Sequence, residues 1–253
     1  MRIKSTLLSA AALVIILCTT VALTAVYNAA PVFFGYTSRV LPIYSVQLPP
    51  EEKAVGLSFD ATYGYEQTKD VLAELDNYGI KATFFLCGIF VEKHPDLTKE
   101  ISDRGHEIGT HGQTHADMSK ISKQSIIEEL KTSRDLIERA IEKKISLFRP
   151  PYGAYNDLLV KTTTEQGLYT IQWDVDSIDW KGYSAPNIAQ RVFSKTKSGS
   201  IILMHNDAKH VIGAIRLVAD KLKKDGYEFR TISNLIYKDN FTLDHTGKQI
   251  RAN

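Results

Sequence analysis

Residues 104–115 read Arg-Gly-His-Glu-Ile-Gly-Thr-His-Gly-Gln-Thr-His, and the predicted fold and site are built around this stretch. It places two histidines, His111 and His115, four residues apart, directly after a short apolar run bounded by glycines. Imidazole is the commonest metal ligand among side chains, and two at this spacing can bind one ion if the backbone turns between them. The same spacing also fits histidines that only hydrogen-bond a turn.

Acidic and histidine side chains also follow three other apolar runs. Asp60 comes directly after one run, Asp176 and Asp179 follow another, and His205 ends a third. In α/β proteins the carboxyl ends of parallel strands meet at one face, where the chemistry is located. The pattern therefore predicts that these side chains converge on one site.

Apolar runs of strand length alternate with segments of helical periodicity through most of the chain. We predict strands at 54–59, 82–86, 106–110, 145–148, 169–173, 200–204 and 227–230, and helices at 66–78, 94–104, 122–143, 156–166, 186–194, 211–224 and 232–236. This repeated order predicts an α/β fold with parallel strands and crossover helices. Both a barrel and an open doubly wound sheet fit it.

The composition indicates an ordinary globular protein. The chain has 253 residues, of which 43% are apolar and 24% charged, and its formal net charge is +2. These values exclude a disordered chain, and the scattered basic residues give no support for nucleic-acid binding. Cys18 lies in the N-terminal apolar segment and Cys87 in a predicted buried strand, so we expect no disulfide. We expect a monomer.

The first 30 residues are predicted to lie outside the fold. Residues 7–26 carry no charge, follow the basic residues Arg2 and Lys4, and are long enough to span a bilayer. We expect residues 1–30 to form an uncleaved signal-anchor, a transmembrane helix that makes the chain a single-pass cell-membrane protein with an extracytoplasmic domain. A cleaved signal and secretion are the alternative. Residues 31–52 read as a linker, 53–237 as the domain and 238–253 as a polar C-terminal tail.

Five short motifs occur in order near the predicted strand ends. They are Ser-Phe-Asp-Ala at 58–61, His-Gly-Gln-Thr-His at 111–115, Arg-Pro-Pro-Tyr-Gly at 149–153, Asp-Ser-Ile-Asp-Trp at 176–180 and Leu-Met-His at 203–205. Over residues 53–237 the chain resembles the polysaccharide deacetylases with a NodB homology domain, carbohydrate esterase family 4. Within that family it is most similar to a membrane-anchored, sporulation-associated subgroup. The resemblance implies a deformed (β/α)7-type barrel rather than an open sheet.

The resemblance also implies a reaction and its residues. The family hydrolyses the acetyl group of an N-acetylated amino sugar with a divalent metal, for which zinc is expected and cobalt, nickel or manganese could substitute. It implies that Asp60 is the general base, oriented by Arg149, and that His205 is the general acid, supported by Asp179. The implied metal ligands are His111, His115 and Asp60. The backbone N–H of Tyr152 would donate to the oxyanion, and Trp180 and Leu203 would form the acetyl pocket. Trp180 fits core packing equally well, and Asp176 is expected either to be structural or to support a neighbouring site residue.

Position 61 departs from the family pattern. The family often has an aspartate there that completes the metal-ligand triad, whereas this chain has Ala61, which cannot bind a metal. Three outcomes are open: Asp60 becomes the third ligand, water fills the gap and the metal binds loosely, or the site is nearly inactive and the domain only binds glycan.

The predicted function is therefore metal-dependent N-deacetylation of a cell-wall polysaccharide, at the N-acetylglucosamine or N-acetylmuramic acid of peptidoglycan. An O-acetyl esterase differs only in its leaving group and remains an alternative. A glycan-binding domain without activity is another alternative, which Ala61 favours and which the retained Asp60, Arg149 and His205 oppose.

Overall fold

The computed structural model describes residues 39–252, and the elements below belong to the unit Val40–Asn253. The expected signal-anchor over residues 1–30 and the first part of the expected linker lie outside the described residues. Within residues 39–252, no helix is both long and apolar enough to cross a membrane.

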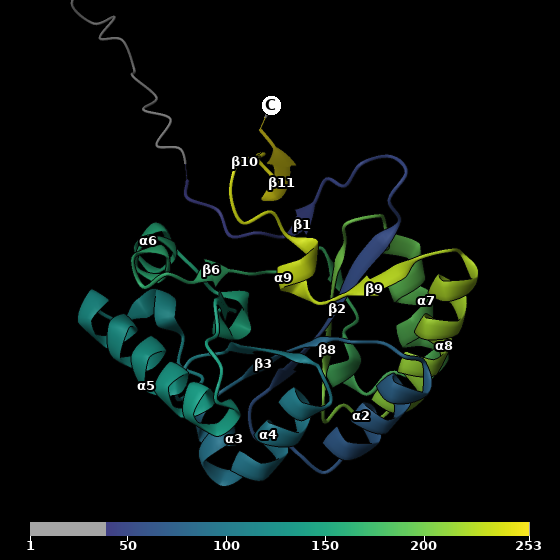
Figure 1. Cartoon of the computed structure of the whole chain (residues 1–253), viewed down its shortest axis with the longest axis horizontal. Coiled ribbons are helices and arrows are strands. Elements are labelled where there is room, and N and C mark those ends of the chain that lie inside the picture. The colour runs from purple at the N-terminus through teal and green to yellow at the C-terminus, as the bar shows by residue number, and fades with distance from the viewer. Residues whose placement is uncertain (1–38, 253) are drawn as a thin grey trace, which may run out of the picture. The chain divides into compact units, whose positions relative to one another are not determined.

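A sheet of parallel strands forms the centre of the fold (Figure 1). Its strand order is β6-β5-β4-β3-β2-β8-β7, and β9 pairs with the start of β2. The strands are β2 (Ala54–Ala61), β3 (Thr83–Leu86), β4 (Glu107–Thr110), β5 (Leu147–Phe148), β6 (Tyr169–Thr170), β7 (Val175–Asp176), β8 (Ile201–His205) and β9 (Glu228–Arg230). The predicted α/β class with parallel strands is confirmed.

Helices cover the outer side of this sheet in an arc (Figure 1). They are α2 (Thr68–Asn77), α3 (Gly88–Lys93), α4 (Pro95–Asp103), α5 (Lys123–Ile141), α6 (Asp157–Glu165), α7 (Ala185–Lys195) and α8 (Val211–Lys224). The short α9 (Ile232–Leu235) lies on the inner side, where Ile232 and Leu235 pack in a second hydrophobic cluster with Ala54 and Phe85. The sequence pattern located most of them to within a few residues. It missed α3 and the two-residue strand β7, which are too short to show a periodicity.

Residues of β2 alternate between the helix layer and the interior of the curved sheet. Leu57, Phe59 and Ala61 belong to the hydrophobic cluster that joins the strands to the helices. Ser58 and Asp60 point the other way and bond Arg149. This alternation follows from the two-residue period of a strand, and it gives consecutive residues of the first motif different environments.

The two end strands of the sheet, β6 and β7, do not pair with each other, so the strands form a half-barrel. The segment before β2 crosses this opening. Ile43 forms a parallel bridge with Ile171 beside β6, and Ser45 forms an antiparallel bridge with Ser200 beside β8. The deformed barrel implied by the motifs is therefore observed as a parallel half-barrel.

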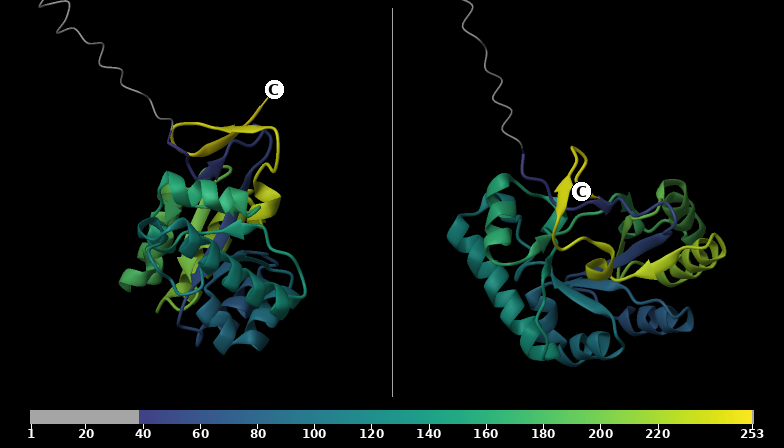
Figure 2. Two further views of the ribbon diagram at one scale, coloured as in Figure 1. Left: turned by 90° about the vertical axis from the view of Figure 1, so that its left-hand side faces the viewer. Right: turned by 45° about the horizontal axis from the view of Figure 1, so that its top comes forward.

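Segments expected to be linker and tail contain a second, three-stranded sheet. Strand β1 (Ser45–Val46) pairs in parallel with β11 (Lys248–Arg251), which pairs antiparallel with β10 (Phe241–Leu243). Figure 2 shows this C-terminal hairpin beside the first described residues. The segments predicted as linker (31–52) and polar tail (238–253) thus contain strands that the sequence pattern did not predict. They are short and mostly polar, so they lack the alternation that reveals a strand.

The long helix α5 positions the loops beside the site. Its N-terminus is capped by Ser122, whose hydroxyl accepts a hydrogen bond from the N–H of Ser125 (3.1 Å). The buried residues Ile126, Leu130 and Ile137 recur at helical spacing and face the sheet.

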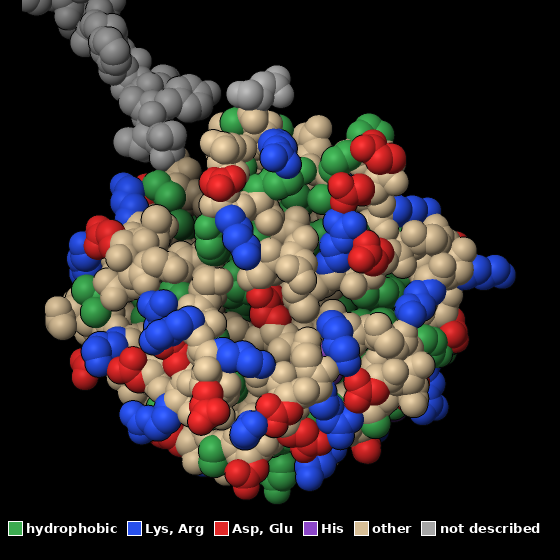
Figure 3. Space-filling view, in the orientation of Figure 1, with side chains coloured by type: hydrophobic (Ala, Val, Ile, Leu, Met, Phe, Trp, Pro, Cys, Tyr) green, Lys and Arg blue, Asp and Glu red, His purple; other side chains and the backbone are tan. Residues whose placement is uncertain are grey.

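Charges elsewhere on the surface are mixed, and Figure 3 shows Lys and Arg interspersed with Asp and Glu on the face it draws.

Candidate active site

The predicted site residues meet at one pocket of about 470 Å³ at the carboxyl ends of β2, β4 and β8. The predicted residues that line it are Asp60, His111, His115, Tyr152, Trp180, Leu203 and His205. Arg149 and Asp179 lie behind the wall and bond Asp60 and His205. The parallel sheet therefore brings together residues that lie far apart in the sequence.

Asp60 is held by a fully buried arginine. The Arg149 Nη1 donates to Asp60 Oδ1 (2.8 Å), and Nη2 donates to the hydroxyl of Ser58 (2.9 Å). The guanidinium lies 4.1 Å from the ring centroid of Phe85. Burial alone would raise the pKa of Asp60, but Arg149 and nearby histidines outweigh it and lower that pKa. Asp60 is therefore ionised at neutral pH.

The two histidines of the opening stretch lie side by side, with ring centroids 5.0 Å apart. The Nδ1 of His111 lies 2.8 Å from the carbonyl oxygen of Arg149, so Nδ1 carries the proton and Nε2 keeps its lone pair. That Nε2 is 3.6 Å from Asp60 Oδ2. Burial lowers the pKa of both rings, that of His115 to about 4. Both are therefore neutral near pH 7, as metal ligands must be.

His205 has the opposite electrostatics. Its Nδ1 bonds Asp179 Oδ1 (2.7 Å), and its backbone N–H donates to the second oxygen of the same carboxylate (2.8 Å). Burial lowers the pKa of His205, but the hydrogen bond and charge of Asp179 outweigh burial and raise that pKa. The pocket thus holds a carboxylate whose pKa is lowered and a histidine whose pKa is raised, so His205 holds its proton to higher pH than a free imidazole does.

Aromatic side chains stand at the mouth of the pocket. Tyr152 lies in the 3-10 turn η2 (Pro151–Gly153) with φ 60°, and its ring is 4.5 Å from that of His115. Trp180 lies in η3 (Asp179–Lys181). Tyr152 is 70% exposed and Trp180 is 61% exposed, so core packing of Trp180 is wrong. Buried Leu203 lines the pocket beneath them.

Comparison with known proteins decides the family. A profile described as polysaccharide deacetylase matches residues 47–171. A peptidoglycan-N-acetylglucosamine deacetylase of Bacillus cereus is 34% identical over 195 residues, which cover 75% of this chain and 91% of that protein. The chain belongs to the polysaccharide deacetylase family.

Further relatives and solved structures include proteins described as deacetylases and one described as a pseudoenzyme. A peptidoglycan-N-acetylmuramic acid deacetylase of Bacillus subtilis is 31% identical over a region that covers 76% of this chain and 75% of that protein. The structure of the Bc1960 peptidoglycan N-acetylglucosamine deacetylase aligns with TM-score 0.73 and 31% identity, over 77% of this chain and 92% of that one. The structure of BA3943 of Bacillus anthracis, described as a CE4 family pseudoenzyme, aligns with TM-score 0.74 and 33% identity. The alignment covers 83% of this chain and 70% of BA3943.

In the pocket of this family member, His111 and His115 form a pair of donors that fits a divalent ion. Two neutral imidazoles lie side by side, and the Oδ2 of Asp60, which is not the oxygen bonded to Arg149, faces one of them. Ala61 is 1% exposed and packs in the helix layer. Across residues 39–252, no group of three or more His, Cys, Asp or Glu side chains is arranged to hold a metal. Within that range Asp60 approaches the pair, with Oδ2 3.6 Å from Nε2 of His111, and its role as third ligand stays a prediction.

Some pocket residues were not predicted from the sequence. Thr62 and Tyr63 follow β2, Asp207 follows β8, and Trp173 follows β6, and all four line the pocket of this polysaccharide deacetylase. Their position directly after strands was the available signal. Asp176 also lines the pocket, and its carboxylate accepts the N–H of Ile178 (2.8 Å), so it stabilises the turn as expected.

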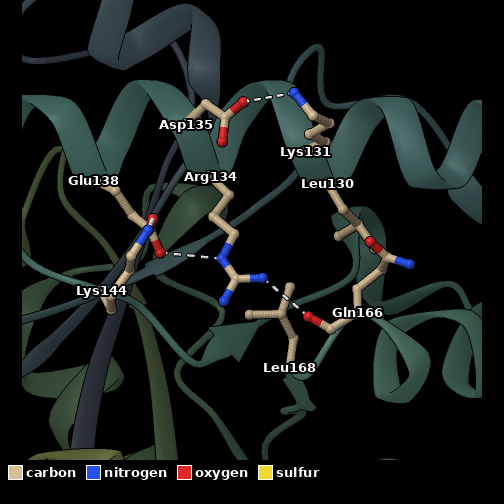
Figure 4. A pocket seen from close by; sticks show the side chains of 8 residues that line it. All are labelled: Leu130, Lys131, Arg134, Asp135, Glu138, Lys144, Gln166 and Leu168. Atoms are coloured by element: carbon tan, nitrogen blue, oxygen red, sulfur yellow. Dashed lines mark hydrogen bonds and ion pairs between the residues drawn. The ribbon is translucent and has the colours of Figure 1, made fainter.

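A second cavity, of about 330 Å³, lies against α5 and contains paired charges (Figure 4). Arg134 donates to Glu138 (3.0 Å) and to the carbonyl oxygen of Gln166 (2.9 Å), while Lys131 pairs with Asp135 (2.8 Å). The bond to Gln166 ties α5 to the end of α6, and the two ion pairs lie within α5. The cations that line this cavity are therefore already paired with carboxylates.

Proposed function

We propose that this protein is a metal-dependent N-deacetylase acting on peptidoglycan. The single observation that carries the proposal is the pocket in which Asp60 is paired with Arg149 and His205 with Asp179. This arrangement supplies a proton acceptor and a proton donor in one cavity. Relatives described as peptidoglycan deacetylases support the substrate class.

The proposed reaction is hydrolysis of the acetamide. Asp60 takes a proton from water while the water oxygen bonds to the acetyl carbon. The C–N bond then breaks, and His205 gives its proton to the departing nitrogen, which leaves as the amine while acetate forms. A divalent ion, zinc by preference, held by His111 and His115 would supply the polarisation of the carbonyl and the acidity of the water. Arg149 keeps Asp60 ionised before the reaction and holds its carboxyl group in orientation.

The mouth of the pocket suits a sugar ring. The exposed faces of Tyr152 and Trp180 offer the flat apolar surface on which sugar C–H groups pack. Asp176 and Asp207 line the pocket, whereas no Lys or Arg is among its described lining residues. A second carboxylate close to Asp176 or Asp207 would be repelled, which favours neutral N-acetylglucosamine over an N-acetylmuramic acid residue with a free carboxylate.

Acetate release tests this function. The purified full-length chain is incubated with zinc and N-acetylated peptidoglycan glycans, alongside Asp60→Asn and His205→Ala variants. Acetate release by the wild-type chain, lost in both variants, is the expected result. No release with zinc supplied, while the fold is retained, contradicts the proposal. For the expected signal-anchor, membrane fractionation of producing cells tests membrane attachment. Recovery in the medium of a chain that lacks the N-terminal segment would instead indicate cleavage.

A glycan-binding domain without activity is the second candidate. Ala61 at the usual ligand position favours it, as does the similarity to BA3943, described as a pseudoenzyme. A mutant of that protein is described as having restored enzymatic activity, which shows that its fold retains the capacity for the reaction. Saturable glycan binding without acetate release would support this candidate.

A further inference from the structure

Glu129 of α5 binds the loop between the two site histidines. Its Oε2 accepts hydrogen bonds from the backbone N–H groups of Gln113 (2.7 Å) and Thr114 (3.0 Å). Its Oε1 accepts the hydroxyl of Thr114 (2.7 Å). One carboxylate thus satisfies three donors of a five-residue loop, and hydrogen bonds to a charged acceptor are stronger than neutral ones.

The loop needs such support because it turns through left-handed backbone at both ends. Gly112 has φ 80° and His115 has φ 62°. For a residue with a side chain such as His115, this conformation is unfavourable and persists only when its surroundings hold it. A Cβ at Gly112 would lie 3.3 Å from Oε2 of Glu129, so glycine also permits the close approach of the carboxylate.

The other side of the loop is bonded to α3. The carbonyl oxygen of Gly112 accepts the N–H of Gly88 (2.9 Å), and that of Gln113 accepts the N–H of Ile89 (3.0 Å). The loop is therefore held by its carbonyls at α3 and by its N–H groups at α5. Of these two attachments, only the one at Glu129 depends on a side chain that can be exchanged without altering the backbone.

We propose that Glu129 is a positioning residue for the histidine pair, setting the separation and orientation of His111 and His115 toward a divalent ion. This role rests on the metal site of the proposed function. Glu129 acts through the backbone of residues 113–114, which lie between the two histidines. Because only two histidines serve as ligands without a completed triad, their mutual geometry carries more of the affinity than in a three-ligand site.

Glu129→Gln tests the role with little change of shape. The amide offers one acceptor oxygen in place of two and presents an NH2 group to donors of the loop. We expect it to weaken Co²⁺ binding by about 10- to 100-fold, the range found when groups that orient metal ligands are removed. The matched control is Glu128→Gln, a neighbouring exposed position on the same helix, for which wild-type affinity is expected.

Co²⁺ binding is measured by visible ligand-field absorption of the full-length chain, beside amide hydrogen exchange at residues 113–114 and the urea unfolding midpoint. Weaker Co²⁺ binding and faster exchange in Glu129→Gln, with the control unchanged, support the role. Wild-type affinity in Glu129→Gln overturns it. If Glu129→Gln does not fold, Thr114→Val removes one of the three bonds, and undiminished affinity there overturns it too. A wild-type chain that binds no Co²⁺ overturns the proposed metal site itself, and this role with it.

Discussion

Replacing Arg149 by methionine tests the buried ion pair on which the site depends. Arg149 is 0% exposed and Asp60 6% exposed, with Nη1 and Oδ1 2.8 Å apart. Removing one member of such a pair leaves an uncompensated buried charge, which costs about 3–5 kcal/mol of unfolding free energy. For a chain of this size that corresponds to a fall in Tm of roughly 6–20 °C.

A double-mutant cycle with Asp60→Asn isolates the pair. Since a buried pair replaced as a whole is often close to neutral, the double variant should be far more stable than the sum of the two single losses predicts. Urea unfolding at neutral pH measures all four proteins. The surface variant Arg104→Met is the control, because Arg104 pairs with Asp76 and Glu100 in solvent and should lose no more than about 1 kcal/mol.

The pH dependence has a defined sign. In the wild-type chain the pKa of Asp60 is lowered in the folded state. Its pairing with Arg149 therefore stabilises the fold at pH values above the unfolded-state pKa of Asp. This stabilisation is lost as the pH falls through the folded-state pKa. Without Arg149, burial raises the pKa of Asp60, and protonation relieves the penalty as the pH falls. The difference in unfolding free energy between wild type and Arg149→Met should therefore become smaller as the pH is lowered. A loss below about 1 kcal/mol at pH 7, or additive single losses, would refute the reasoning.

Three further outcomes are expected. Ala61→Asp should tighten Zn²⁺ binding about tenfold or more, because a third ligand that contributes about 1.4 kcal/mol of binding free energy changes the affinity tenfold. Unchanged affinity in calorimetry would show that a side chain at position 61 cannot leave the helix layer. Buried His106, with its pKa lowered by burial to about 4, binds fewer protons folded than unfolded between pH 6.5 and 4. Stability should fall by up to about 3 kcal/mol on acidification across that window, and His106→Gln should flatten this part of the urea-measured profile, whereas an unchanged slope would exclude His106 as the cause. Asp179→Asn should lower the pKa of His205 in NMR titration and move the alkaline limb of kcat/KM to lower pH; a constant pKa would contradict the role of the carboxylate.

The local pattern of the sequence predicted which segments become strands and helices. Apolar runs such as 54–59 and 200–204 are strands in the structure, because burial on both faces selects a continuous apolar run. The order of motifs then predicted that Asp60, His111 and His205 would meet, since parallel strands place their carboxyl ends together. The strands of the second sheet were missed because their pairing, not their own pattern, makes them strands.

Other features depended on contacts between distant parts of the chain. The bond from Arg149 to Asp60 joins residues 89 positions apart, and Trp180 was equally compatible with the core or the surface until its 61% exposure was seen. Glu129 gave no signal in its sequence context, because a glutamate on an amphipathic helix reads as a solvated residue.

The sequence by itself thus determined the α/β class, the strand ends that carry the chemistry and the departure at Ala61, since all three are properties of residue type and local period. The family resemblance implied the pairs Asp60–Arg149 and His205–Asp179, but only the tertiary structure decided that the pKa of Asp60 is lowered, that the pKa of His205 is raised and that Ala61 packs among the helices. The physical reason is that charge state and ligand geometry depend on burial and on distances of a few ångströms between side chains, which the folding of the whole chain sets.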